Sequence, residues 1–492
     1  MSNGMDILKY IAPKLAYKRQ AWRNAYDEQK RNYDAGTFDR LNRNWYAFNE
    51  SAETTDRDYR DIVRARSRDL ERNSDIMNAN IYPWIRNVVG KGFTLEAKTP
   101  DETLNTQIEK LWRKWCKKEN CDVTRMQSLA EMARMAVRRK KVDGAALFVK
   151  CYTPDGLLPF KLQALEVDEL DGTQFAPHTP GNRVVGGVEY NSYNRPVGYW
   201  IKQYDIEGYT TLAPRYVPRE NVIFMFSKTR PSQIREMPEM AATISRIKET
   251  NGYIEAASMK ERIAACLSVF IKKVLPSGGL GVQSTPGEKN DYGKVELAPG
   301  LITELNAGDD IQVVNPGASA TDGSNFVKLM SRLIAAGQGI SYEATSRDLS
   351  EANYSSARQA MIEDEEQFEP EQAKLLDEFY DEVYKSFIES AVLTGTLDIG
   401  SEYWTDPDTY TEHEWNKKPK KWIDPLKEAN GNKVSLESGQ KTLVDIWAEQ
   451  GKDYKTVIDE LKKIQDYAAE VGLNTALPYL GGGEQDGNRT EI

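Results

Sequence analysis

Histidine and cysteine are scarce in this sequence, which has two His and four Cys among 492 residues. The cysteines form no C-x-x-C pair, and both histidines lie far from them along the chain. A structural zinc site needs four such ligands at defined spacing, so we exclude one. Scattered cysteines in a long chain are typical of reduced, buried apolar side chains rather than of a disulfide framework. These residues are Cys116, Cys121, Cys151, Cys266, His178 and His413.

Long apolar runs are also missing. The longest strongly apolar stretch, Ile263 to Ile271, has nine residues, whereas a membrane span needs about 20. The N-terminus is amphipathic but contains neither the apolar core nor the cleavage site of a signal peptide. The sequence therefore predicts a soluble protein that is made in a cytosol and does not contact a membrane.

The sequence lacks the common catalytic motifs as well. None of its three Gly-Lys pairs is followed by Ser or Thr, so the phosphate cradle of an ATPase is absent. It contains neither a G-x-S-x-G elbow nor an H-E-x-x-H helix. We expect no enzymatic activity, no cofactor and no bound metal.

One acidic run keeps an enzymatic alternative open. Glu363, Asp364, Glu365 and Glu366 could supply carboxylates to a metal-dependent nuclease. Adjacent residues of a helix point in different directions, however, and only Glu363 and Glu366 share a face. A helix face turned to solvent or to a partner is the favoured interpretation.

Charge is unevenly distributed along a chain whose net charge is −10. Lys110 to Lys141 has eleven basic and three acidic residues, and Met361 to Ser390 has eleven acidic and two basic ones. An acidic total disfavours a protein that grips nucleic acid, because such proteins concentrate Lys and Arg. The two segments are either solvated helix faces or surfaces that meet between the subunits of an oligomer.

Periodicity predicts a mainly helical chain that is interrupted by a β-rich module. Helical patterns surround strand-like runs between residues 145 and 227, which Asp-Gly, Pro-Gly and Glu-Gly turn signals separate. The expected helices cover Asp56 to Leu70, Thr103 to Cys116, Arg125 to Val142, Pro238 to Ile271, Phe326 to Ile334, Ser356 to beyond Tyr384, and Asp453 to Val471.

The start of the helix near residue 356 carries a capping signal. Ser356 followed by Gln359 fits a capping box, which places Arg358 at the second helical position. The positive end of the helix dipole disfavours a cation there. Arg358 therefore either faces an acidic partner on a neighbouring chain or tolerates the cost in solvent.

Several blocks of the sequence resemble lambda-type bacteriophage portal proteins. The signature is Asn353-Tyr354-Ser355-Ser356-Ala357-Arg358, preceded by the segments Ile334 to Glu343 and Arg347 to Ser350. Further blocks occur in the same order along about 400 residues, which makes the resemblance specific. They are Val63 to Asn73, Asn87 to Phe93, Leu162 to Asp171, Gly187 to Trp200, Lys260 to Ile271 and Lys420 to Glu428.

The resemblance implies an α+β, mainly helical, elongated subunit with a wing, stem, clip and crown, which assembles into a closed ring of about twelve copies. We expect an N-terminal helical and wing region at 1–160, a β-rich module including the clip at 161–230, and a stem helix at 231–272. Wing strands, a mobile loop and the tunnel loop follow at 273–325, a long helix and crown at 326–480, and a disordered tail at 481–492.

The resemblance also implies the function and partners. The ring occupies one capsid vertex of the virion, assembles in the host cytoplasm, and conducts DNA during packaging and ejection. A terminase motor, head-completion or adaptor proteins, tail proteins, capsid and scaffolding proteins would bind it, and double-stranded DNA would pass through without sequence recognition. A head–tail adaptor ring is the second alternative, although adaptors are usually shorter.

Two groups of residues are expected to carry this role. The first is a small, nearly neutral loop facing the DNA channel: Asn315, Pro316, Gly317, Ala318, Ser319, Ala320, Thr321, Asp322, Gly323 and Ser324. The second is the family motif at a subunit contact: Asn353, Tyr354, Ser355, Ser356 and Arg358.

Overall fold

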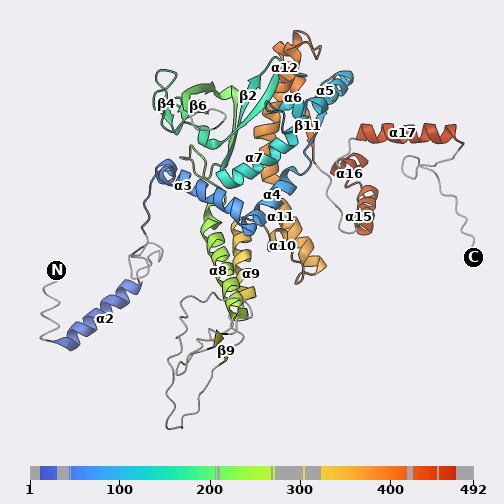
Figure 1. The fold of residues 1–492 in the computed structure, drawn as a ribbon. Coiled ribbons are helices and arrows are strands. Elements are labelled where there is room, and N and C mark those ends of the chain that lie inside the picture. Colours follow the sequence, from blue (N-terminus) through green and yellow to red (C-terminus); the bar gives the residue numbers. More distant parts are fainter. Residues whose placement is uncertain are drawn as a thin grey trace, which may run out of the picture. The chain divides into compact units, whose positions relative to one another are not determined.

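The computed structural model describes residues 12–29, 44, 46–204, 207, 211–266, 270–271, 303–304, 323–417, 425–450 and 454–472 (Figure 1). The chain divides into a first unit, residues 1–55, and a second unit, residues 56–492, which contains all of the described strands. Helix α2, Pro13–Gln29, belongs to the first unit, and α3, Ala52–Asn73, begins in it. The predicted mixture of helices and sheets is confirmed.

Helix α4, Asp75–Trp84, follows α3 after a single capping residue. Ser74 caps α4, because its side chain accepts a hydrogen bond from the Met77 amide at 3.2 Å. Pro83 lies in the last turn of α4 and has no backbone N–H to donate. A π-helical turn, Ile85–Val89, follows directly after α4. Gly90 and Gly92 then take positive φ angles and lead into strand β1, Thr94–Ala97.

Helices α5, Glu102–Trp115, and α7, Leu129–Asp143, confirm the next two predicted helices, with the short α6, Lys118–Cys121, between them. The apolar faces of α5 and α7 meet in the main core. There Trp115 stacks on Phe160 with ring centroids 5.2 Å apart, and the Trp115 indole N–H donates to the Phe160 carbonyl at 3.0 Å.

Three of the cysteines belong to this part of the chain and are free thiols, as predicted: Cys116, Cys121 and Cys151. Burial raises the pKa of Cys121 to about 12. That thiol is therefore protonated at neutral pH and acts as an apolar side chain.

The predicted β-rich module forms two antiparallel sheets. Strand β2, Ala145–Tyr152, lies between β3, Phe160–Leu165, and β8, Val222–Phe226. Its side chains alternate between two cores, with Ala146 and Phe148 in the main core and Ala145 and Leu147 in a second one. The second sheet has the order β4 (Arg183–Val185), β5 (Val188–Tyr190), β6 (Pro196–Tyr204) and β7 (Thr211–Pro218).

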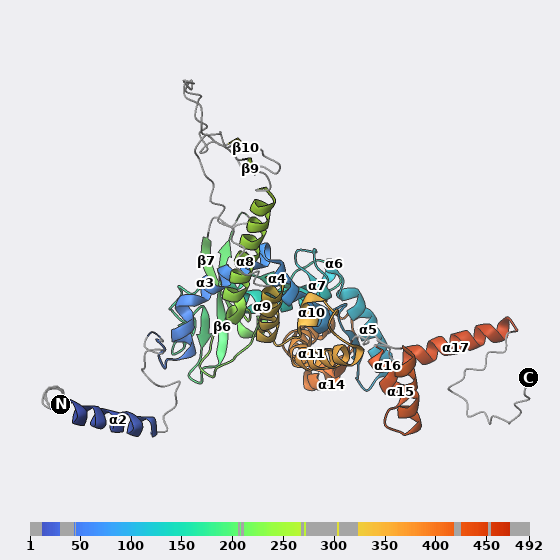
Figure 2. The same ribbon diagram turned by 90° about the horizontal axis from the view of Figure 1, so that it is seen from below.

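Two helices that are distant in sequence run antiparallel to each other: α8, Ala241–Cys266, and α9, Gly323–Gly337 (Figures 1 and 2). The Gln338 side chain, just after α9, donates to the Thr243 hydroxyl at 3.0 Å, near the start of α8. At the other end of α9, the rings of Tyr253 and Phe326 lie 4.5 Å apart. The helix expected from Pro238 starts at Ala241, because residues 239 and 240 form a turn in which the Ala241 amide donates to the Pro238 carbonyl at 3.0 Å.

The predicted long helix after residue 356 is also present. It comprises α11, Tyr354–Leu375, a π-helical turn, Leu376–Tyr380, and α12, Asp381–Leu393, and the short α10, Tyr342–Ser346, precedes it. Short elements α13, Glu402–Thr405, and α14, Pro407–Thr411, lead to β11, His413–Asn416, which pairs antiparallel with β1.

Three helices end the described chain: α15, Pro425–Glu437, α16, Leu443–Glu449, and α17, Tyr454–Glu470. The last of these confirms the helix expected at 453–471. Strands β9, Phe270–Ile271, and β10, Thr303–Glu304, pair in parallel. Most of the segment 273–325, where wing strands and a mobile loop are expected, and the whole tail 481–492 lie outside the described residues.

Candidate functional site

The predicted channel loop is described only at its end. Residues 315–322 lie outside the described residues, while Gly323 and Ser324 already belong to α9. A Cβ at position 323 would come within 2.9 Å of the Tyr253 hydroxyl on α8. Glycine thus permits the close approach of the two helices at the point where α9 begins.

The family motif caps α11 in a different way from the prediction. Asn353, rather than Ser356, is the N-cap: its side chain accepts from the Ser356 amide at 2.8 Å, and the Ser356 hydroxyl accepts from the Asn353 amide at 3.0 Å. Arg358 is therefore the fifth helical residue, beyond the first turn where the dipole acts. Its position gives no sign of an electrostatic conflict.

The segment between α9 and α11 is fastened to α11 by a buried carboxylate. Asp364 accepts from the Ser341 amide at 2.7 Å and from its hydroxyl at 2.6 Å, and the Ser341 hydroxyl in turn caps α10 by accepting from Ala344 at 3.1 Å. One member of the acidic run therefore has a structural partner, whereas Glu363 and Glu366 are exposed. Among the described residues, no group of three or more His, Cys, Asp or Glu side chains is placed to hold a metal ion.

The same segment is fastened to α9 by charge. Lys328 and Arg332 contact the two carboxylate oxygens of Glu351 at 2.6 and 3.0 Å. Both cations also lie over the ring of Tyr342, at 5.8 and 5.4 Å from its centroid. The hydrogen bond and charge of Lys328 lower the pKa of Glu351, so this carboxylate is ionised at neutral pH.

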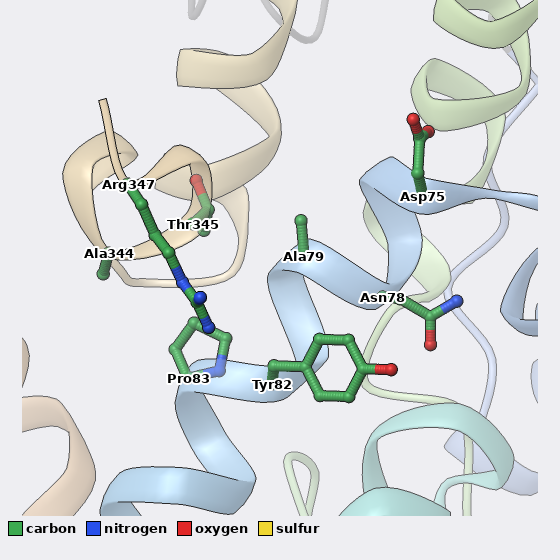
Figure 3. Close-up of a pocket in the computed structure, with 8 residues that line it drawn as sticks. All are labelled: Asp75, Asn78, Ala79, Tyr82, Pro83, Ala344, Thr345 and Arg347. Atoms are coloured by element: carbon green, nitrogen blue, oxygen red, sulfur yellow. The ribbon is translucent and has the colours of Figure 1, made fainter.

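A cavity of about 340 Å³ lies between α4 and the end of α10 (Figure 3). Arg347, which has a left-handed φ of 57°, reaches from the end of α10 toward Pro83 on α4. The lining residues are Asp75, Asn78, Ala79, Tyr82, Pro83, Ala344, Thr345 and Arg347. Residues of α4 and of the segment between α9 and α11 thus line the same cavity.

The two segments of opposite charge meet inside the subunit at one point, an outcome that neither expected alternative, solvated helix faces or a contact between subunits, includes. Lys140 of α7 contacts Glu371 of α11. Lys150 of β2, which lies beyond the segment Lys110 to Lys141, is 3.0 Å from Glu382 of α12. Lys140 is 1% exposed, so this contact is part of the fold rather than of a surface available to another copy.

Glu239 joins this buried charge cluster at the start of α8. It lies 2.6 Å from the ammonium group of Lys141 and 3.3 Å from that of Lys140, and it accepts from the Ser227 hydroxyl at 2.7 Å. Although burial acts in the opposite direction, the charges of Lys141 and Lys140 lower the pKa of Glu239 to about 2. The Lys141 ammonium also lies 3.4 Å from the centroid of the Trp84 ring.

A second buried cluster connects α3 to the chain before α8. Glu236 is fully buried and accepts from Arg64 and Arg235, and its backbone carbonyl accepts from Arg60. Sequence reasoning missed both clusters. The available signal was the presence of Glu236 and Glu239 in the proline-containing segment before a long helix. This pattern does not indicate which basic residues they pair with.

The comparison with protein families settles what kind of chain this is. Residues 38–372 match the family described as phage portal protein, lambda family. The chain belongs to the lambda family of phage portal proteins. The matched region covers the three-stranded sheet, the α8–α9 pair and most of α11, including the motif at 353–358.

Individual portal proteins agree with this assignment. The chain is 26% identical over 444 residues to the probable portal protein of Halomonas phage phiHAP-1, covering 86% of this chain and 84% of that protein. It is 21% identical over 434 residues to portal protein B of Escherichia phage lambda, covering 80% and 81%. A chain in the neck of an empty gene transfer agent (GTA) particle aligns with a TM-score of 0.39 and 13% identity, over 83% of this chain and 94% of the other.

Portal proteins are structural rather than catalytic, which fits the expectation that this chain is not an enzyme. No helix among the described residues is long and apolar enough to cross a membrane.

Proposed function

We propose that copies of this chain form a closed ring of about twelve subunits at one capsid vertex, and that DNA enters the capsid and leaves it through this ring. The observation that carries the proposal is the portal-family match over residues 38–372. The ring would assemble in the host cytoplasm and remain part of the virion.

The partners follow from what the chain lacks and from its family. Since the sequence has no phosphate-cradling motif, the force for packaging must come from a separate motor, a terminase, which docks on the ring. Head-completion, adaptor and tail proteins would take the place of the terminase after packaging. Capsid and scaffolding proteins would surround the ring at the vertex.

The segment 315–324 is proposed to face the DNA. Asp322 is its single charged residue, and the other nine are small or polar. Each Lys or Arg that contacts a phosphate releases counterions and so binds the duplex more tightly, which would resist sliding. Ser319→Arg together with Thr321→Arg should slow packaging in a reconstituted motor assay, whereas Ser319→Gln with Thr321→Gln should not.

The fold supports a stem of two helices, whereas the sequence predicts one. We propose that α8 and α9 together form the stem. Strands β3 and β8, at the two ends of the module predicted to include the clip, contribute Leu162, Ile223 and Met225 to the main core. We therefore propose that the clip lies elsewhere. Residues 267–322 connect the two helices at the ends opposite to Thr243 and Gln338, and we propose that the part of this connection before the channel segment, residues 267–314, supplies the clip.

The motif at residues 353–358 is proposed to lie at a subunit contact. Ser355, Ser356 and Arg358 are exposed at the start of α11. An Arg358→Glu variant should weaken ring assembly, whereas Arg358→Lys should keep it. Equal assembly of both variants would remove the motif from the interface.

Light scattering of the purified full-length chain tests the proposal. A ring predicts a mass about twelve times the 55.8 kDa of one chain. The nuclease would instead be supported by a monomer that cleaves DNA when metal is added. Changing Glu363 and Glu366 to Gln should then abolish the cleavage. A ring that docks on a separate portal would support the adaptor.

A further inference from the structure

The basic segment Lys110 to Lys141 divides into two parts that differ in what they contact. Its last six basic residues all have partners in the subunit. Arg125 pairs with Asp155, Arg134 donates to the Gly90 carbonyl at 2.8 Å, Arg138 and Arg139 pair with Glu71, Lys140 with Glu371, and Lys141 with Glu239. These charges are used by the fold itself.

The first five basic residues have no such partners. Lys110, Arg113, Lys114, Lys117 and Lys118, called the α5 stripe here, are all exposed. Within the part of the chain that the structure describes, none of the five side chains forms a hydrogen bond or ion pair. The charge of Lys118 does act on a nearby acid, since it adds to the hydrogen bonds of Ser128 in lowering the pKa of Glu131.

Helical geometry places the core of this stripe on the outer side of α5. The buried residues Leu104, Ile108, Trp112 and Trp115 define the inner face of the helix. With 3.6 residues per turn, Lys110, Arg113 and Lys114 fall on the opposite face. These three side chains therefore lie on the side of α5 that does not pack against the core.

The fold by itself does not account for these five charges. Arg113 and Lys114, in the last turn, complement the helix dipole, but Lys110 lies a turn earlier and Lys117 and Lys118 lie beyond the helix end. Lys110 and Lys114 are a like-charge pair four residues apart, which destabilises a helix. Between residues 110 and 118 the sequence has no acidic residue.

The composition of the surrounding surface indicates the class of partner. No large apolar side chain is exposed between residues 102 and 119. The outer face of α5 instead carries Thr103, Thr106 and Gln107 beside the cations. The one exposed acid of α5, Glu102, is paired with Lys455 at 2.7 Å. Protein interfaces have an apolar core and are depleted in Lys, whereas phosphate groups of nucleic acids are contacted mainly by Lys, Arg and hydroxyl or amide side chains.

We propose that the α5 stripe binds the phosphate backbone of double-stranded DNA, without reading its sequence, through residues other than those of the channel segment 315–324. The proposal rests on the proposed function in one respect, since that function brings duplex DNA to this protein. A low-friction channel segment and a DNA-binding stripe are compatible, because they involve different residues.

The test measures the affinity of the full-length protein for a short duplex of mixed sequence as a function of salt. The variant combines Lys110→Gln, Arg113→Gln and Lys114→Gln. Each phosphate contact contributes about 0.9 to the slope of log affinity against log salt, so the slope should become shallower by about 2.7. The ratio of the DNA affinity of the wild type to that of the variant should then fall about 40-fold between 50 and 200 mM salt.

A matched control removes the same charge elsewhere. Arg66→Gln, Lys462→Gln and Lys463→Gln change three exposed cations on α3 and α17 and should leave the slope unchanged. An unchanged slope in the α5 variant, or an equal change in both variants, would overturn the proposal. Polyglutamate that competes as well as duplex DNA would also overturn it and indicate an acidic protein partner.

Light scattering on the same samples separates the two proposals. A ring that keeps its mass while the α5 variant loses the salt-dependent binding supports both. A wild-type monomer whose slope still depends on the stripe would refute the ring but keep the DNA surface.

Discussion

Replacing Glu239 with Gln should destabilise the protein by about 3 kcal/mol at pH 7. Folding lowers the pKa of Glu239 from its ordinary 4.5 to about 2, and this difference corresponds to about 3 kcal/mol of stabilisation of the ionised carboxylate. An independent estimate agrees, because removing one partner of a buried ion pair costs about 3–5 kcal/mol. The variant would leave Lys141 and the 1% exposed Lys140 with less compensating charge.

The sign of the pH dependence is fixed by the direction of this shift. Since folding lowers the pKa, the stabilisation is fully present above pH 4.5 and is lost as the pH falls toward 2. The difference between wild type and variant should therefore be constant from pH 5 to 8 and smaller by about 1 kcal/mol at pH 4.

Urea unfolding of the full-length chain, followed by tryptophan fluorescence, measures both quantities. Trp84 lies next to Lys141 and makes the signal sensitive to this cluster. Glu366→Gln, an exposed acid on α11, is the control and should change stability by less than about 0.5 kcal/mol. A loss below 1 kcal/mol for Glu239→Gln, or a difference that grows as the pH falls, would refute the reasoning.

Three further substitutions test local features of the fold by the same unfolding assay. Asn353→Ala removes the cap of α11 and should cost about 1 kcal/mol, with faster amide exchange at Ser356; unchanged exchange would contradict the cap. Gly144→Ala should cost more than about 2 kcal/mol, because φ is +95° and a Cβ would lie 2.4 Å from the Met237 backbone; an unaffected melting temperature would argue against this packing. Asp364→Ala should cost about 2–4 kcal/mol by leaving donors at the start of α10 unpaired, and a neutral effect would rule out that role.

Much of the fold could be predicted from the sequence because its elements are long and periodic. The run of β2 is apolar on both faces, and the apolar residues of α5 and α9 recur at helical spacing, so these elements follow from local patterns. Strand β11 could not be found in this way. Its four residues, His413–Asn416, become a strand by pairing with β1 more than 300 positions earlier.

The candidate site was less predictable, for two physical reasons. Asn353 and Ser356 can both serve as caps, and each has a suitable partner three residues later, so the local sequence does not decide where α11 begins. Charge patterns also do not reveal their partners. The excess charges of 110–141 and 361–390 were visible, but only the fold shows that Lys140 contacts Glu371 within one chain.

Cryo-electron microscopy of the purified full-length protein would show whether its copies enclose a channel. We expect closed rings with a central channel wide enough for a duplex, bordered by side chains of which few are Lys or Arg. Isolated subunits without a channel, or a channel lined mainly by cationic side chains, would contradict this expectation.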